Sequence, residues 1–325
     1  MRLFITLSIL IFFSLNANSQ GCCSGGGGSP IAGGVSQGVL PVKNLEFSIS
    51  NQYIRSEKFY TGDRDTNVDY LFNSNYLYYK VSYGITEALT LSLEGGYYVN
   101  KQLDDIKANT YSSSSGISDL IIFPRYQIYR KATDSVVTEI TGGLGMKIPL
   151  GAYADSFVVY TDAQGVNSYT TSPPTVQATT GSNDFIFYGF FLRAYPQTKI
   201  KFFANALYVR KGWNPLGQNF GDYASFGISM SKSFRRKFGA AIQLKGEWIG
   251  MMETDPLVDM VAFYNVDVAS TGGRKISIAP QINYTYKNLS LFALTEIPLY
   301  QYMNGTQLGA QYQVIFGVLY RVCLD

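Results

Sequence analysis

The sequence predicts an all-β protein, namely a single closed antiparallel transmembrane β-barrel of about twelve strands with short periplasmic turns and long outer loops. One observation is alternation: Tyr312, Val314 and Phe316 share one face of the last segment, opposite Gln313 and Gly317. A period of two is typical of a strand with one apolar side. Another is that no apolar run after the N-terminal signal approaches the ~18 residues of a membrane helix, although the chain has 26 Tyr and 21 Phe.

The N-terminal region predicts export. Residues 1–19 contain a basic Arg2, an apolar stretch and small residues before Gln20, which is the pattern of a secretory signal peptide. A lipoprotein site at Cys22 is the alternative, but Ser19 and Gln20 depart from its usual pattern, so we favour plain cleavage near Ser19 or Gln20. Residues 20–43 are rich in Gly and Cys and predict a flexible leader, and residues 44–325 predict the barrel.

The strand candidates are separated by connections whose lengths alternate. Five connections, beginning near residues 86, 130, 195, 234 and 287, are short, and those between them are long. Outer-membrane barrels have short periplasmic turns and long outer loops, whereas a soluble β-sandwich has no reason to sort its loops in this way. The expected strands are 45–55, 75–85, 88–100, 117–129, 136–149, 183–194, 199–210, 222–233, 238–250, 275–286, 289–301 and 310–322.

Charged residues within the strands fall on the face opposite the apolar one. A charge on the lipid face costs up to about 2–4 kcal/mol at mid-membrane, so these side chains are expected in the lumen, which the pattern predicts to be polar with both signs. Residues 199–210 alternate poorly. The candidates for the lumen or a constriction are Lys80, Glu94, Asp119, Arg125, Glu139, Lys147, Asp184, Lys245, Glu247 and Arg321.

Two of these candidates occur in a repeated pattern. Gly116 and Asp119 begin one strand, and Gly181 and Asp184 begin another. Both aspartates are expected where a long outer loop enters the barrel. They cap loop amides, which is the commoner role of Gly and Asp in turns, or they form part of a constriction.

Residues 81–97, 116–126 and 143–151 together resemble the family of outer-membrane transporters named for the MetA pathway of phenol degradation. The resemblance is good over about residues 75–195 and otherwise rests on strand pattern. It implies a barrel of ~12–14 strands that passes small, often hydrophobic molecules without a TonB-type plug. It also implies an architecture related to the long-chain fatty-acid channels, and it carries over no catalytic residues.

Pro124 lies within a predicted strand, and Gly189 occupies the equivalent position of the repeat. Proline removes a ladder hydrogen bond and often marks a kink or bulge. Because the fatty-acid channels open a side exit at a strand kink, the resemblance makes both residues kink candidates. A tolerated bulge at the barrel rim is the alternative.

Three cysteines, Cys22, Cys23 and Cys323, are expected on the periplasmic side. That compartment is oxidising, so a disulfide from the leader to the last strand is one interpretation. A soft-metal site for Cu(I) is another, although no histidine or Met-rich motif accompanies the thiols. We therefore predict no metal and no cofactor.

The chain contains no histidine. Barrel enzymes generally depend on histidine as a base, so we predict no catalytic residues and no enzymatic activity. The net charge is +3 and basic residues stand mostly singly, which does not indicate nucleic-acid binding.

The expected location is the outer membrane of a Gram-negative bacterium. The partners expected are its lipid bilayer, the barrel-assembly machinery during insertion, and a small-molecule solute that the sequence does not identify. The favoured function is passive uptake of small molecules, hydrophobic ones included, with the leader as a partial plug. The alternative is a non-conducting structural or assembly barrel that presents outer loops such as 150–182 to partners. The composition of loop 150–182 is equally compatible with folding inward as a constriction.

Overall fold

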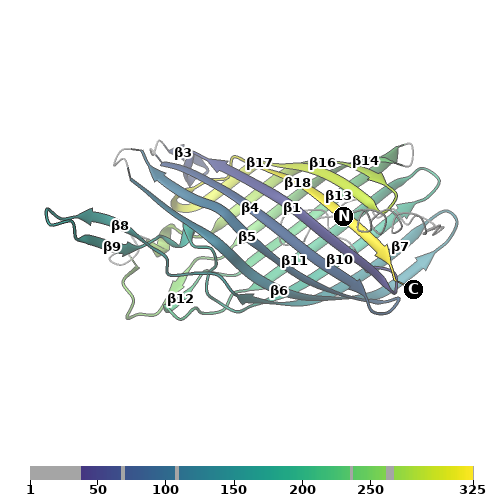
Figure 1. Cartoon of the computed structure of the whole chain (residues 1–325). Helices are drawn as coiled ribbons and strands as arrows, with labels where there is room; N and C mark the ends of the chain where they lie inside the picture. Colours follow the sequence, from purple (N-terminus) through teal and green to yellow (C-terminus); the bar gives the residue numbers. More distant parts are fainter. Residues whose placement is uncertain (1–37, 67–69, 107–109, 235–236, 261–266, 325) are drawn as a thin grey trace, which may run out of the picture.

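The computed structural model describes residues 38–66, 70–106, 110–234, 237–260 and 267–324. Twelve long antiparallel strands form one sheet that closes on itself, because β1 pairs with β18 and β16 pairs with β17. Figure 1 shows the barrel from the side, with the C-terminus at the end that carries the tight turns. The barrel strands are β1 (Asn44–Ser56), β4 (Tyr70–Gly84), β5 (Leu89–Asp105), β6 (Thr110–Ala132), β7 (Val137–Pro149), β10 (Asp184–Tyr195), β11 (Ile200–Arg210), β13 (Tyr223–Phe234), β14 (Phe238–Ile249), β16 (Gly273–Tyr286), β17 (Leu289–Leu308) and β18 (Tyr312–Cys323).

The expected closed antiparallel barrel is confirmed, and each expected strand corresponds to one of these twelve. Several outer connections are shorter than predicted. β5 and β6 stay paired as far as Asp105 and Thr110, within the expected loop 101–116. β4 begins at Tyr70, and β17 continues to Leu308. Strands that remain paired beyond the membrane keep their backbone groups hydrogen-bonded, which favours this extension.

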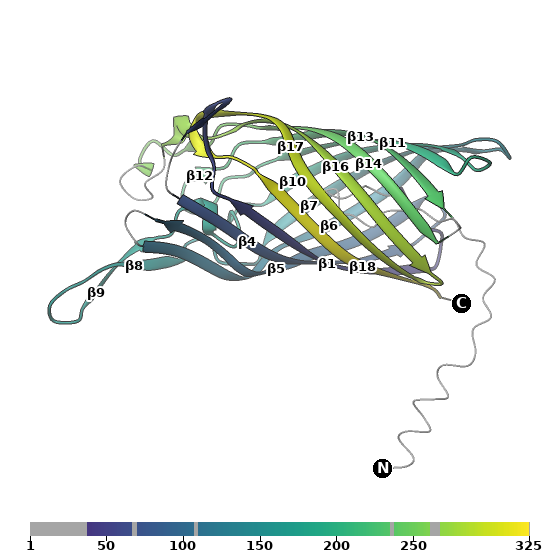
Figure 2. The same cartoon turned by 90° about the horizontal axis from the view of Figure 1, so that it is seen from above.

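Several shorter elements lie at the outer end of the barrel. Figure 2 shows the β8–β9 hairpin reaching beyond the end of the barrel. Within the described residues, no helix has the length and apolar character needed to cross a membrane. The additional elements are β2 (Phe59–Gly62), β3 (Arg64–Thr66), β8 (Ser156–Thr161), β9 (Asn167–Thr171), β12 (Gln218–Asn219), β15 (Glu253–Thr254) and the single-turn 3-10 helices η1 (Pro174–Val176) and η2 (Val268–Ser270).

The outer face of the barrel is apolar, and its periplasmic edge is aromatic. Phe226, Ile228 and Met230 of β13 are 57%, 49% and 47% exposed, whereas Ser225 and Ser229, which point the other way, are buried. Large side chains that are exposed near the periplasmic ends of the strands include Phe234 and Phe238. An apolar band with aromatic borders is how a transmembrane barrel meets lipid.

Candidate functional site in the barrel lumen

The structure places the predicted lumen charges on the inner face of the barrel. Their side chains are buried or half-buried, whereas apolar neighbours of opposite parity are exposed, such as Tyr79 and Val81 beside Lys80. The inner-face set contains Lys80, Glu94, Asp119, Arg125, Glu139, Lys147, Asp184, Lys245, Glu247 and Arg321.

A belt of alternating charge crosses adjacent strands near the periplasmic half. Arg321 of β18 binds Glu46 of β1 with 2.5 Å between Nη2 and Oε2. Lys80 of β4 lies opposite Glu94 of β5 in the ladder, and Arg125 of β6 donates to Ser92 of β5. Neighbouring strands therefore place opposite charges side by side, which compensates for their removal from water.

A second group of four charged residues, two lysines and two glutamates, is connected by ion pairs on β14, β16 and β17. Lys245 Nζ lies 2.6 Å from Glu296 Oε2 and 3.3 Å from Glu247 Oε1. Lys275 Nζ lies 2.7 Å from Glu247 Oε2 and 3.0 Å from Glu296 Oε1. The Lys245–Glu247 pair lies within β14, and the other three pairs join strands that are adjacent or next-nearest around the barrel, so all four run along the wall.

Lys275 and Glu296 are functional-site candidates that the sequence reasoning missed. Both lie in strands that were expected, and their strand parity places them with the other lumen charges. Extending the parity argument to every charge of those two strands would have found them.

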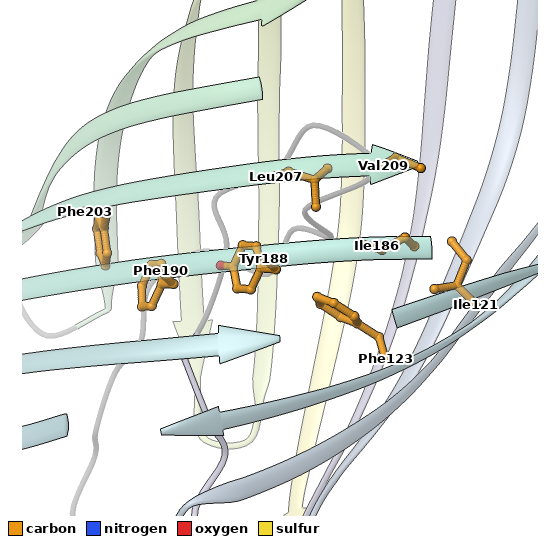
Figure 3. Packing of buried hydrophobic residues seen from close by; sticks show 8 residues of the cluster. All are labelled: Ile121, Phe123, Ile186, Tyr188, Phe190, Phe203, Leu207 and Val209. Atoms are coloured by element: carbon orange, nitrogen blue, oxygen red, sulfur yellow. The ribbon is translucent and has the colours of Figure 1, made fainter. Parts of the chain in front are cut away.

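The inner face also carries an apolar wall, which the sequence did not predict. It lies on β6, β10 and β11 and runs from near the outer ends of the last two strands to near their periplasmic turn (Figure 3). The ring centroids are 5.6 Å apart for Phe123 and Tyr188, 6.4 Å for Tyr188 and Phe190, and 5.9 Å for Phe190 and Phe203. The apolar wall consists of Ile121, Phe123, Ile186, Tyr188, Phe190, Phe203, Leu207 and Val209.

The apolar wall explains why residues 199–210 alternate poorly. On β11, Phe203, Leu207 and Val209 are buried on the inner face, while Phe202 and Tyr208 are exposed on the lipid face. Both faces of this strand are apolar, so a period-two contrast is weak. The prediction of a polar lumen therefore holds for only part of the inner face, because apolar and aromatic side chains line it at β6, β10 and β11.

Glycines on β7 make room for this wall. A Cβ atom at Gly145 would lie 2.6 Å from Cδ2 of Phe123 and 3.3 Å from Cβ of Ile186. At Gly143 the same atom would lie 3.1 Å from Cζ of Phe123. The Phe123 ring can therefore lie across β7 and reach β10, because β7 has no side chains at these two positions.

Residues 172–182, here called the inward segment, pack against the inside of the outer end of the barrel. Ser172, Val176 and Ala178 are at most 2% exposed. Lys101 of β5 donates to the Gln177 carbonyl at 2.8 Å. The later part of the loop thus folds inward, while the earlier part forms the projecting β8–β9 hairpin.

A charged cluster, here called the latch, holds the inward segment to the barrel. Lys147 Nζ lies 2.8 Å from Asp184 Oδ2 and 3.7 Å from Asp119 Oδ1, and it donates to the Thr180 hydroxyl at 2.5 Å. The Thr179 hydroxyl donates to Asp119. The two aspartates of the repeated pattern therefore meet through one lysine at the mouth.

Asp184 has a second cation and two further donors. Lys211 Nζ lies 3.3 Å from its Oδ2, while the Ser182 hydroxyl and the Gly212 amide donate to its Oδ1 at 2.7 and 3.0 Å. Burial lowers the pKa of the Lys211 ammonium group below its usual value, although the Asp184 carboxylate acts in the opposite direction. Asp184 therefore caps a loop amide and also pairs with two lysines at the outer end of the barrel.

Pro124 and Gly189 lie on the lipid side of continuous strands. Ile122 faces Met146 and Arg125 faces Gly143, so the register of β6 and β7 is the same before and after Pro124. A Cβ atom at Gly189 would meet nothing within 4 Å. The chain passes Pro124 without an inserted residue, and packing within the described residues does not require glycine at position 189.

The chain reaches β1 from the lumen side. Leu40 is 3% exposed and its amide donates to Thr90 Oγ1 at 2.7 Å, and a Cβ atom at Gly38 would overlap the Glu139 carboxylate. Cys323 is exposed with a free thiol, whereas Cys22 and Cys23 lie outside the described residues. Within the part of the chain that the structure describes, no group of three or more acidic or sulfur ligands is arranged for a metal ion.

A closed barrel with a lipid-facing apolar surface and paired lumen charges defines an outer-membrane β-barrel, located in the outer membrane of a Gram-negative cell. The chain is similar to the COG4313 outer membrane channel from Pseudomonas putida F1, with a TM-score of 0.66 and 12% identity over 88% of this chain and 97% of that one. This similarity shows a shared fold.

Two other solved structures are more distantly similar. The translocator domain of autotransporter NalP from Neisseria meningitidis gives a TM-score of 0.46 at 11% identity, over 87% of this chain and 90% of that chain. The TodX monoaromatic hydrocarbon channel gives 0.42 at 9% identity, over 88% and 91%. No protein-family model and no curated protein sequence matches the chain.

Proposed function

We propose that this protein is a passive outer-membrane channel for small apolar molecules, aromatic ones included. The single observation that carries the proposal is the apolar wall, because a lumen that served only water and ions would not need a row of aromatic rings inside it. Each Å² of apolar solute surface that leaves water is worth about 25 cal/mol, so an apolar solute that reaches these rings is stabilised by contact with them.

The electrostatics of the lumen support the same substrate class. Lys245, Glu247, Lys275 and Glu296 neutralise one another, and Arg321 and Glu46 do the same. A wall of paired charges offers little net attraction to an anion or a cation. A neutral solute that contacts the aromatic rings is therefore favoured over an ion, in agreement with the substrates that the resemblance to the MetA-pathway transporters implies.

Uptake by intact cells tests this proposal. Cells that produce the wild-type chain are expected to take up a radiolabelled neutral aromatic, such as toluene, faster than cells without it. Cells that produce the Phe190→Ala/Phe203→Ala variant at equal outer-membrane levels are expected to lose most of that gain. Equal uptake in all three strains would contradict the proposal.

A non-conducting barrel that presents its outer loops is the second candidate. The observation that favours it is the inward segment, whose buried residues occupy the mouth. Purified protein in planar bilayers distinguishes the two candidates, because a variant that releases the latch conducts only if the rest of the lumen is open.

The N-terminal assignments belong to the same proposal. Residues 1–19 are proposed as a removed signal and residues 20–43 as a leader that partly plugs the pore, which agrees with the buried position of Leu40. N-terminal sequencing of the mature protein tests the first assignment. Conductance of a mature chain without residues 20–37 tests the second, since an unchanged value would contradict a plug.

The side exit at Pro124 and Gly189 stays a proposal. Gly189→Leu is expected to slow apolar uptake if solutes leave the barrel there.

A further inference from the structure

A groove of about 730 Å³ lies between two neighbouring periplasmic turns. One side is the turn that joins β10 to β11 and contains Lys199. The other side is formed by Lys232 and Phe234 at the end of β13 and by Phe238 at the start of β14. The Ser233 amide donates to the Lys199 carbonyl at 3.2 Å, which holds the turn to the end of β13. The groove is thus a built feature of the periplasmic rim.

The groove opens toward the membrane. Lys232 and Phe234 continue the face of β13 on which Phe226, Ile228 and Met230 are exposed to lipid. Phe238, directly opposite Phe234 in the ladder, forms the other aromatic side, and the two rings are 55% and 45% exposed, respectively. The groove therefore lies where the apolar band of the barrel ends and the periplasmic headgroup region begins.

The polar side of the groove is cationic. In the described ranges neither Lys199 nor Lys232 forms an ion pair with a carboxylate; the Lys232 ammonium lies 5.9 Å from the centroid of the Phe234 ring. Lys237 and Lys287 lie at the same end of the barrel, over the ring of Tyr286. The local field favours an anion, and the adjacent rings favour hydrocarbon.

We infer that this groove binds an anionic glycerophospholipid of the periplasmic leaflet. Its phosphate would be neutralised by the ammonium groups of Lys199 and Lys232, and its acyl chains would follow Phe234, Phe238 and the exposed face of β13. Lysine is a recognised phosphate-binding side chain, and aromatic side chains are favoured where one end is apolar and the other wet.

Native mass spectrometry of the full mature chain, titrated with phosphatidylglycerol or with phosphatidylcholine of identical acyl chains, tests the inference. Wild-type protein is expected to bind phosphatidylglycerol at least tenfold more tightly. Lys199→Gln/Lys232→Gln is expected to lose that preference, while Lys43→Gln/Lys131→Gln, which removes two exposed lysines elsewhere at the periplasmic end, keeps it. An unchanged preference in the first variant, or an equal loss in the second, would overturn the inference.

A second variant and a competition measurement complete the experiment. If the glutamine variant fails the heat-modifiability test for a folded barrel, Lys199→Arg/Lys232→Arg replaces it and is expected to keep the preference, so that a loss there contradicts the inference. Soluble glycerol phosphate is expected not to displace bound phosphatidylglycerol at millimolar concentration. Displacement would identify a site for a soluble phosphate ester and would overturn the assignment to lipid.

Discussion

Lys147 Nζ lies 2.8 Å from Asp184 Oδ2, so that a buried lysine of β7 is joined to the first residue of β10. The same ammonium group donates to Thr180 of the inward segment. One cation therefore connects the barrel wall with the inward segment. A change in this pair is expected to affect both the stability of the barrel and the width of the pore.

Asp184→Asn should release the latch. The substitution leaves Lys147 and Lys211 buried without their shared carboxylate, and breaking a buried pair on one side costs about 3–5 kcal/mol. We expect a lower free energy of unfolding and a larger single-channel conductance, measured in planar bilayers. Asp65→Asn is the matched control, because it breaks the exposed Lys58–Asp65 pair (3.2 Å), a kind of contact worth about 0–1 kcal/mol. Equal conductance of Asp184→Asn and wild type would contradict the role of the latch.

Gly145→Ala should disturb the apolar wall. The new methyl group would meet the Phe123 ring at 2.6 Å, and overpacking of this kind costs about 1–3 kcal/mol. Gly189→Ala on the adjacent strand is the control, because its methyl group meets open space and alanine is preferred to glycine within a strand by about 0.5–1 kcal/mol. Urea unfolding from detergent micelles measures both. A Gly145→Ala barrel as stable as Gly189→Ala would show that Phe123 does not need the space.

Phe190→Ala/Phe203→Ala should weaken solute binding without changing the lipid-facing surface. Both rings belong to the apolar wall, and their loss removes the stacked pair at 5.9 Å. Phe187→Ala/Phe202→Ala removes two exposed rings from the other face of the same strands. We expect only the first variant to require higher concentrations of a small neutral aromatic to block the ion current, by about tenfold if the lost contact is worth about 1.4 kcal/mol. An equal shift in both variants would place the solute outside the lumen.

The pH dependence of stability should report Lys211. Burial lowers the pKa of its ammonium group in the folded protein, so between that value and the unfolded value of about 10.4 the unfolded chain binds more protons. The free energy of unfolding of the wild type should therefore rise with pH in that window, relative to Lys211→Met. Chemical unfolding of both proteins from pH 7 to 10 measures the difference. A gap that stays constant, or that falls with pH, would contradict the shift.

The sequence predicted the position of a side chain correctly where the wrong position would cost free energy in the membrane. A charge on the lipid face is costly, so parity alone placed Lys80, Glu94 and Arg125 inside, where they are buried. No comparable penalty forbids an apolar side chain in the lumen. Phe203 and Leu207 therefore left only a weakened alternation on β11, and the apolar wall was not predicted.

The path of the outer loops was also beyond the sequence argument. The pattern did not decide whether residues 150–182 fold inward or outward, and the structure does both, with the β8–β9 hairpin outside and Val176 buried. That outcome depends on contacts between segments far apart in the chain, such as Lys101 with Gln177. The repeated Gly116–Asp119 and Gly181–Asp184 pattern identified two members of the latch but did not show that Lys147 joins them.

The most direct test of the central claim is the ion current through single molecules of the full mature chain in planar bilayers, recorded with and without a small neutral aromatic. We predict a measurable current that is larger in Asp184→Asn and interrupted by the aromatic in a concentration-dependent way. The interruptions should be weaker in Phe190→Ala/Phe203→Ala. Silence in both wild type and Asp184→Asn, or a current that the aromatic leaves unchanged, would contradict a channel with an apolar path for solutes.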